Sequence, residues 1–103
     1  MQRKFKLIRG GTVVLGHTVS QTDVLIEGER IRAIGDFGDF RADEVVDAGG
    51  LLVLPGAVDT HVHFNDVFMG TVSVHDYYTG TLAAAHGGVT SIVDFSNQVP
   101  GGT

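Results

Sequence analysis

The sequence predicts an α/β fold with a β-rich first half and a strand, helix and strand in its second half. Short apolar runs separated by glycine and aspartate fill residues 5–54, a pattern typical of short strands joined by turns. Residues 57–95 instead hold two apolar runs on either side of one segment with helical spacing. We expect the boundary at Pro55-Gly56, because proline gives no amide hydrogen to a strand ladder, and therefore divide the chain into 1–54 and 55–103.

The first half is expected to form a small β-sandwich segment. Its strands are predicted at residues 5–8, 12–15, 23–26, 30–34, 44–46 and 51–54. Glu27-Gly28-Glu29 predicts a tight hairpin between the third and fourth of these runs. Gly10-Gly11 and Gly49-Gly50 predict further turns, since glycine adopts positive φ angles without a Cβ penalty.

The second half is expected to form one βαβ unit. Residues 57–63 and 90–95 predict parallel strands, and residues 74–86 predict the helix between them. Ser73 can cap this helix, Asp76 lies in its first turn, where the helix dipole favours an anion, and Gly87-Gly88 ends it. Its apolar face is expected at Tyr77, Tyr78, Leu82 and Ala85.

Two histidines one residue apart end the first strand of this unit. Side chains alternate along a strand, so His61 and His63 point to the same side, with Cα atoms ~6.6 Å apart. Two neutral imidazoles so placed can bind one cation at roughly 2.0–2.1 Å each. The alternative is a pair of exposed or hydrogen-bonded histidines. Asp59 shares their face and is predicted either to support a ligand imidazole or to bond backbone as a structural carboxylate.

These residues carry a resemblance to a known family. The stretch Pro-Gly-x-x-Asp-x-His-x-His at 55–63 resembles the first-strand signature of the amidohydrolase superfamily. Residues 68–71, 76–81, 83–85, 87–90 and 93–95 resemble its cyclic amidohydrolase branch, dihydropyrimidinase and D-hydantoinase. Allantoinases are similar at His-Val-His-Phe-Asn, but the longer Phe-Met-Gly-Thr link favours the dihydropyrimidinase side. Val67 departs from the proline normal in both.

The resemblance implies a β-sandwich segment followed by the start of a TIM-type barrel. Such a barrel takes ~250 residues, and 103 residues hold its first strand, first helix and second strand only. The chain is therefore expected to be the amino-terminal part of a longer enzyme and to be inactive alone. A self-contained small domain is the alternative.

The resemblance also implies the chemistry. His61 and His63 would be metal ligands in a site holding two zinc ions, with a bridging carbamylated lysine, two more histidines and an aspartate expected beyond residue 103. Phe64, Asn65 and Phe68 would line the substrate pocket. Asp66 could contact the substrate as well, although a solvated loop is the alternative for Asn65 and Asp66. The reaction implied is ring opening of a dihydropyrimidine or hydantoin, a cyclic imide or ureide, to an N-carbamoyl amino acid, with no organic cofactor.

Two other functions stay open within this resemblance. One is allantoinase, and the other is a non-catalytic scaffold related to dihydropyrimidinase, against which the presence of both His61 and His63 argues. The resemblance further implies a cytoplasmic homotetramer acting on a small cyclic amide.

Composition excludes several classes of function. The formal charge is −5, and four of the seven basic residues lie in the first nine positions, so no nucleic-acid surface is expected. No run approaches the ~20 apolar residues of a membrane span, and no signal peptide is recognisable. The absence of cysteine excludes a disulfide framework.

Overall fold

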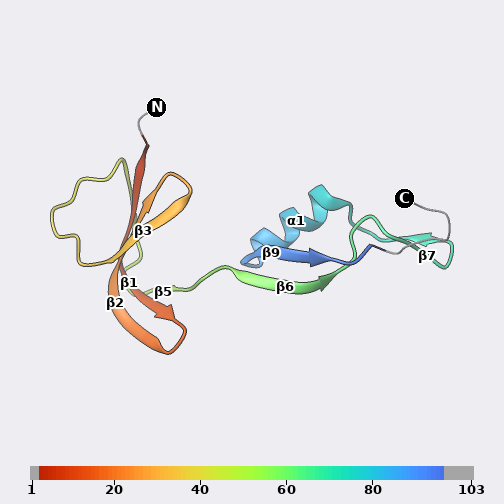
Figure 1. Ribbon diagram of the computed structural model, residues 1–103, viewed down its shortest axis with the longest axis horizontal. Helices are drawn as coiled ribbons and strands as arrows, with labels where there is room; N and C mark the ends of the chain where they lie inside the picture. The colour runs from red at the N-terminus through yellow and green to blue at the C-terminus, as the bar shows by residue number, and fades with distance from the viewer. Residues whose placement is uncertain (1–2, 97–103) are drawn as a thin grey trace. The chain divides into compact units, whose positions relative to one another are not determined.

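The computed structural model describes residues 3–96 and divides the chain into two compact units, Met1–Pro55 and Gly56–Thr103 (Figure 1). The first, here called unit 1, contains strands only. The second, unit 2, contains short strands and a single helix among its described residues. The described chain is thus mostly β with one helix.

Unit 1 is a five-stranded sheet built around its first strand. Its strands are β1 (Phe5–Leu15), β2 (Thr18–Glu27), β3 (Arg30–Gly35), β4 (Glu44–Asp47) and β5 (Leu52–Val53). The order is β3-β2-β1-β4, with β5 also paired to β1. The β1–β2 and β2–β3 pairs are antiparallel, whereas β4 and β5 run parallel to β1. The tight turn predicted at Gly28-Glu29 joins β2 to β3.

The turn predicted at Gly10-Gly11 is wrong. β1 continues through both glycines, and its register with β2 shifts between Ile8 and Gly11, which marks a β-bulge. Gly10 has φ +70°, so its positive backbone angle is used inside the strand and not in a chain reversal. Asp23 fixes the bulge, since its Oδ1 accepts a hydrogen bond of 2.8 Å from the Gly10 amide.

A sandwich needs a second sheet facing the first. The described part of unit 1, residues 3–55, contains one sheet. Its buried hydrophobic side chains come from both middle strands and from the loop before β5, namely Leu7, Val13, Val24, Leu25 and Ala48. The sandwich therefore remains a prediction for a longer protein.

Unit 2 places two parallel strands beside a helix. Its elements are β6 (Ala57–Val62), β7 (Val67–Phe68), β8 (Thr71–Val72), α1 (Tyr77–His86) and β9 (Val89–Asp94). β6 and β9 pair in parallel, and the chain passes between them through the β7–β8 hairpin and α1 (Figure 1). The sequence predicted this strand, helix and strand order but missed the short hairpin.

The predicted start of the helix is also wrong. Helix α1 begins at Tyr77, and its amino-terminal cap is Asp76. The Oδ1 atom of Asp76 accepts a 2.8 Å hydrogen bond from the Thr79 amide. Ser73 lies outside the helix and accepts a 2.8 Å hydrogen bond from the Asp66 amide. A carboxylate three residues before a free helix amide satisfies that amide directly, which fixes the helix start at Asp76.

Much of the apolar surface of unit 2 is exposed. Tyr78 is 74% exposed and Leu82 is 47% exposed, and Gly80 is the buried residue of α1. Gly80 is buried because the Phe64 ring lies against it, where an added Cβ would come within 2.6 Å. The predicted apolar face of the helix is therefore only partly covered in this unit.

Candidate metal centre

The two histidines of the His-x-His motif converge at the end of β6. His61 lies within the strand, and His63 follows its last residue, Val62. Their Nε2 atoms are 3.1 Å apart. If each nitrogen lay about 2.05 Å from one ion, this separation would give an angle of about 100° at that ion, between octahedral and tetrahedral values. The pair therefore fits two sites on one divalent metal.

The backbone of Phe95 sets the orientation of the His63 ring. His63 Nδ1 is 2.7 Å from the Phe95 carbonyl oxygen and 3.3 Å from Asp66 Oδ2. A carbonyl can only accept, so Nδ1 carries the proton of the neutral ring and Nε2 keeps its lone pair. That tautomer is the one a metal requires of Nε2.

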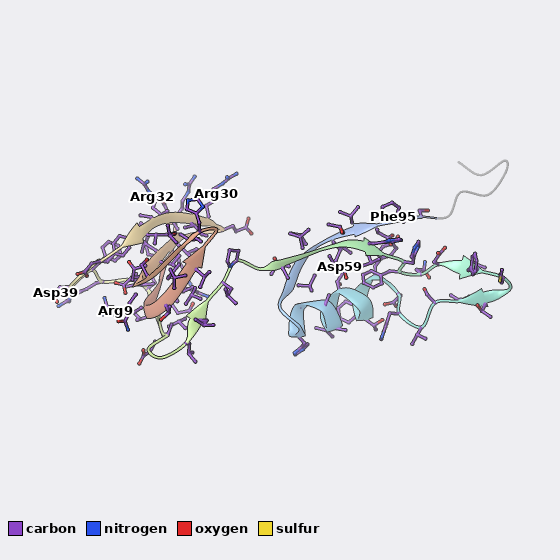
Figure 2. The ribbon with its side chains drawn as sticks, turned by 90° about the horizontal axis from the view of Figure 1, so that it is seen from below. Arg9, Arg30, Arg32, Asp39, Asp59 and Phe95 are labelled. Carbon is purple, nitrogen blue, oxygen red and sulfur yellow. The ribbon has the colours of Figure 1, made fainter. Side chains whose placement is uncertain are left out.

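The surroundings of His61 are apolar on one side and polar on the other. Its ring lies against the ring of Phe95, with centroids 4.7 Å apart. Asp59, which Figure 2 shows on the strand, accepts a 3.1 Å hydrogen bond at Oδ1 from the backbone amide of His61. The observed contact of Asp59 is thus with backbone, and support of a ligand imidazole by Asp59 stays a prediction.

The pair alone is not a complete metal site. Within residues 3–96, no group of three or more histidine, cysteine or acidic side chains is placed to hold a metal. Catalytic zinc normally has three protein ligands. The described residues therefore fit part of a centre, with other ligands required from elsewhere.

A concave surface adjoins His63. Its lining residues are His63, Asp66, Phe68, Thr71, Val72 and Ser73. Three of these six residues, Phe68, Thr71 and Val72, belong to the β7–β8 hairpin, so this hairpin forms one wall beside the candidate ligand. Asp66, for which the sequence left substrate contact or a solvated loop open, lies in this lining, and its contact with the substrate stays a prediction.

The predicted pocket residues occupy different surroundings. Phe68 lines the concave surface beside His63. Phe64 instead packs on Gly80 and meets the Tyr77 ring edge-on at a centroid distance of 6.2 Å. Asn65 has φ +49°, and its backbone amide donates a 2.9 Å hydrogen bond to the backbone carbonyl of His75. Contact with the substrate stays a prediction for Phe64, Asn65 and Phe68.

Asp94 ties the segment after β6 to the helix. Its Oδ1 accepts a 3.1 Å hydrogen bond from the backbone amide of Phe64, and its Oδ2 accepts a 2.6 Å hydrogen bond from the Tyr77 hydroxyl. The Tyr77 hydrogen bond is the main reason that the pKa of Asp94 lies below its usual value, and the same bond raises the pKa of Tyr77. Asp94 is therefore held ionised by groups that also position Phe64.

Comparison with known proteins points to one enzyme family, although no family model matches the chain. A D-hydantoinase of Geobacillus stearothermophilus is 44% identical over 90 residues, covering 87% of this chain and 19% of that protein. A dihydropyrimidinase of Rattus norvegicus is 48% identical over 95 residues, covering 87% and 18%. A dihydroorotase of Lactobacillus helveticus is 45% identical over 94 residues, covering 91% and 21%.

The fold agrees with the same family. The crystal structure of a dihydropyrimidinase from Brevibacillus agri matches 96% of this chain with a TM-score of 0.90 and 47% identity, and the match covers 22% of that protein. The chain thus spans about a fifth of the length of the relatives it matches. No helix among residues 3–96 is long and apolar enough to cross a membrane. The chain belongs to the dihydropyrimidinase and D-hydantoinase family of cyclic amidohydrolases and matches the amino-terminal part of its members.

Proposed function

We propose that this chain supplies the first two metal ligands, His61 and His63, of a hydrolase that opens the ring of a cyclic ureide or imide. The product would be an N-carbamoyl amino acid. The observation that supports this most directly is the 3.1 Å approach of the two Nε2 atoms at the end of β6. The two histidines lie in a chain that is 44% identical in sequence to a D-hydantoinase and 48% identical to a dihydropyrimidinase.

The chain's own residues have distinct roles in this proposal. His61 and His63 would hold the ion through Nε2, and the Phe95 carbonyl keeps the proton of His63 on Nδ1. A bound divalent metal would polarise a ring carbonyl and lower the pKa of a water molecule. Phe68, on the wall beside His63, would contact the substituent of the substrate ring. Asp66, whose Oδ2 lies 3.3 Å from the same Nδ1 atom, would be a second acceptor that keeps the His63 ring in place.

The rest of the site would come from a longer protein. We propose that residues 1–54 belong to a β-sandwich and residues 55–103 to the first βαβ unit of a TIM-type barrel. Support comes from the parallel β6–β9 pair and from relatives about five times the length of this chain. A lysine, further histidines and an aspartate would complete a two-zinc centre, and this chain alone would be inactive. The cytoplasmic homotetramer is part of the same proposal.

The relatives that match the chain suggest which cyclic amides are the candidate substrates. Dihydropyrimidine and hydantoin are the leading candidates, because those enzymes stand among the first matches in both sequence and structure. Dihydroorotate is the second candidate, because dihydroorotases match at comparable identity. These rings share the cyclic amide bond that the proposed chemistry cleaves.

A chimeric enzyme tests the proposal. This chain would replace the aligned 90-residue segment of the Geobacillus stearothermophilus D-hydantoinase. Turnover of hydantoin, dihydrouracil, dihydroorotate and allantoin would be measured, together with bound metal. We expect a metal-containing, active chimera that His61→Ala weakens by ~100-fold or more, since even outer partners of metal ligands cost 10–100-fold.

The control is His86→Ala, which removes a histidine from the last turn of α1. This chimera should retain turnover and metal. Undiminished activity of the His61→Ala chimera would reject the ligand assignment. A folded chimera of the unsubstituted chain that contains no metal would favour the scaffold function instead.

A further inference from the structure

We infer that Phe95 is a positioning residue that orients both candidate metal ligands, one through its ring and the other through its backbone carbonyl. Figure 2 shows Phe95 at the end of β9, beside the strand that carries the histidines. Its ring lies 4.7 Å from the His61 ring, and its carbonyl oxygen lies 2.7 Å from His63 Nδ1. This inference rests on the proposed metal site.

The parallel pairing of β6 and β9 brings Phe95 to this place. Val62 pairs with Asp94 in the sheet, and the Phe95 amide donates a 2.9 Å hydrogen bond to the Val62 carbonyl. Val62 stands between the two histidines, so the residue bonded to its carbonyl lies beside both of them. The sheet therefore holds the backbone of Phe95 through a hydrogen bond that involves neither imidazole.

The carbonyl contact determines which nitrogens carry protons when metal is absent. His63 donates from Nδ1 to the Phe95 carbonyl, so its neutral Nε2 can only accept. The 3.1 Å contact between the Nε2 atoms then requires His61 to donate from Nε2. For both Nε2 atoms to hold a metal through their lone pairs, that one proton of His61 would have to lie on Nδ1 instead of Nε2. The two rings therefore start in different tautomers and finish in the same one.

The ring contact has a separate task. Among residues 3–96, the ring of His61 contacts two other rings, those of His63 and Phe95, and Phe95 is the one of these that is not itself a candidate ligand. Loss of the ring should free His61 to rotate while the backbone bond to His63 remains. Substitution of one residue thus separates the two effects.

Nuclear magnetic resonance of the metal-free chain tests the inference first. Ring nitrogen signals would be recorded at about pH 8.5, about two units above the ordinary histidine pKa. We expect His63 protonated at Nδ1 and His61 at Nε2. In Phe95→Leu, His63 should keep its tautomer, while the His61 ring signals shift and their contacts to His63 weaken. Phe95→Tyr should restore the original spectrum.

Binding of Zn²⁺ alone to the same variants gives the second readout. Phe95→Leu should weaken the affinity about 10-fold, as for other outer partners of a ligand, and Phe95→Tyr should recover it. Phe64→Leu is the matched control. It removes another packed ring from unit 2, one that lies against Gly80 and not against a histidine. It should leave the His61 signals close to those of the unsubstituted chain.

The outcomes separate this inference from the proposed function. His61 signals and zinc affinity unchanged in Phe95→Leu, or a change equalled by Phe64→Leu, would overturn the positioning role. Protonation of His63 at Nε2 would overturn the role of the carbonyl. A chain that shows the expected tautomers and the Phe95 effect on His61, but binds no zinc, would keep the positioning role and reject the metal site.

Discussion

The two units of the chain differ in what they contain: unit 1 has the buried hydrophobic side chains, and unit 2 has the candidate metal ligands. Among the described residues, every buried hydrophobic side chain belongs to unit 1, with Leu7 fully buried at the centre of its sheet. Unit 2 carries the candidate ligands, yet its strands and helix expose large apolar side chains such as Val58, Tyr78 and Val93. Over its described residues, 56–96, the unit that brings two imidazoles together thus has no buried hydrophobic side chain to match the core of unit 1. Parallel sheets normally have both faces covered, which explains why these residues are apolar.

The largest expected effect is on the core of unit 1. Leu7→Ala should destabilise the fold of unit 1 by about 3 kcal/mol, the usual cost of a cavity left by a buried leucine. Leu82→Ala on α1, where the side chain is 47% exposed, should cost far less. Urea unfolding followed by amide signals of each unit would measure both. Equal costs for the two substitutions would break the comparison between the units.

A smaller effect is expected at the bulge of β1. Asp23 is 8% exposed and accepts hydrogen bonds from the amides of Gly10 and Phe37. Asp23→Ala should leave these donors without their acceptor and cost about 2 kcal/mol. The same urea experiment measures it, with the exposed Asp39→Ala as a control. A variant as stable as the original chain would show that water replaces the carboxylate at the bulge.

The smallest effect is expected at the start of α1. The Thr79 amide lowers the pKa of Asp76 below the ordinary 3.8, so ionised Asp76 stabilises the folded helix. That stabilisation is complete above pH 3.8 and is lost as the pH falls through the lower folded value. Helical chemical shifts of residues 77–80 should therefore weaken at acid pH.

Asp76→Asn sharpens this last test, because asparagine can cap a helix but does not titrate. Its helix should show no such acid transition at the first turn. An identical acid transition in Asp76→Asn would assign the change to another group. The comparison between the units predicts that the sheet of unit 1 keeps its amide signals over the same pH range.

Several elements of the fold could be predicted from local pattern. Short apolar runs separated by glycine and aspartate indicated most strands, and Glu27-Gly28-Glu29 indicated the hairpin between β2 and β3. The errors fell where two signals compete. Gly10-Gly11 has the composition of a turn, but hydrogen bonds from β2 on both sides hold it in a bulge. Ser73 and Asp76 can both cap a helix, and the contact with Thr79 decides for Asp76.

The sequence by itself determined that His61 and His63 share one face, because side-chain direction alternates with every residue of a strand. It also determined the family resemblance, which the comparisons confirm. Only the tertiary structure decided what orients these rings. Phe95 lies 32 residues after His63, and it reaches the histidine through the register of β6 with β9. Strand pairing between distant segments depends on the packing of the whole unit, and no local periodicity encodes which residue stands opposite a given imidazole.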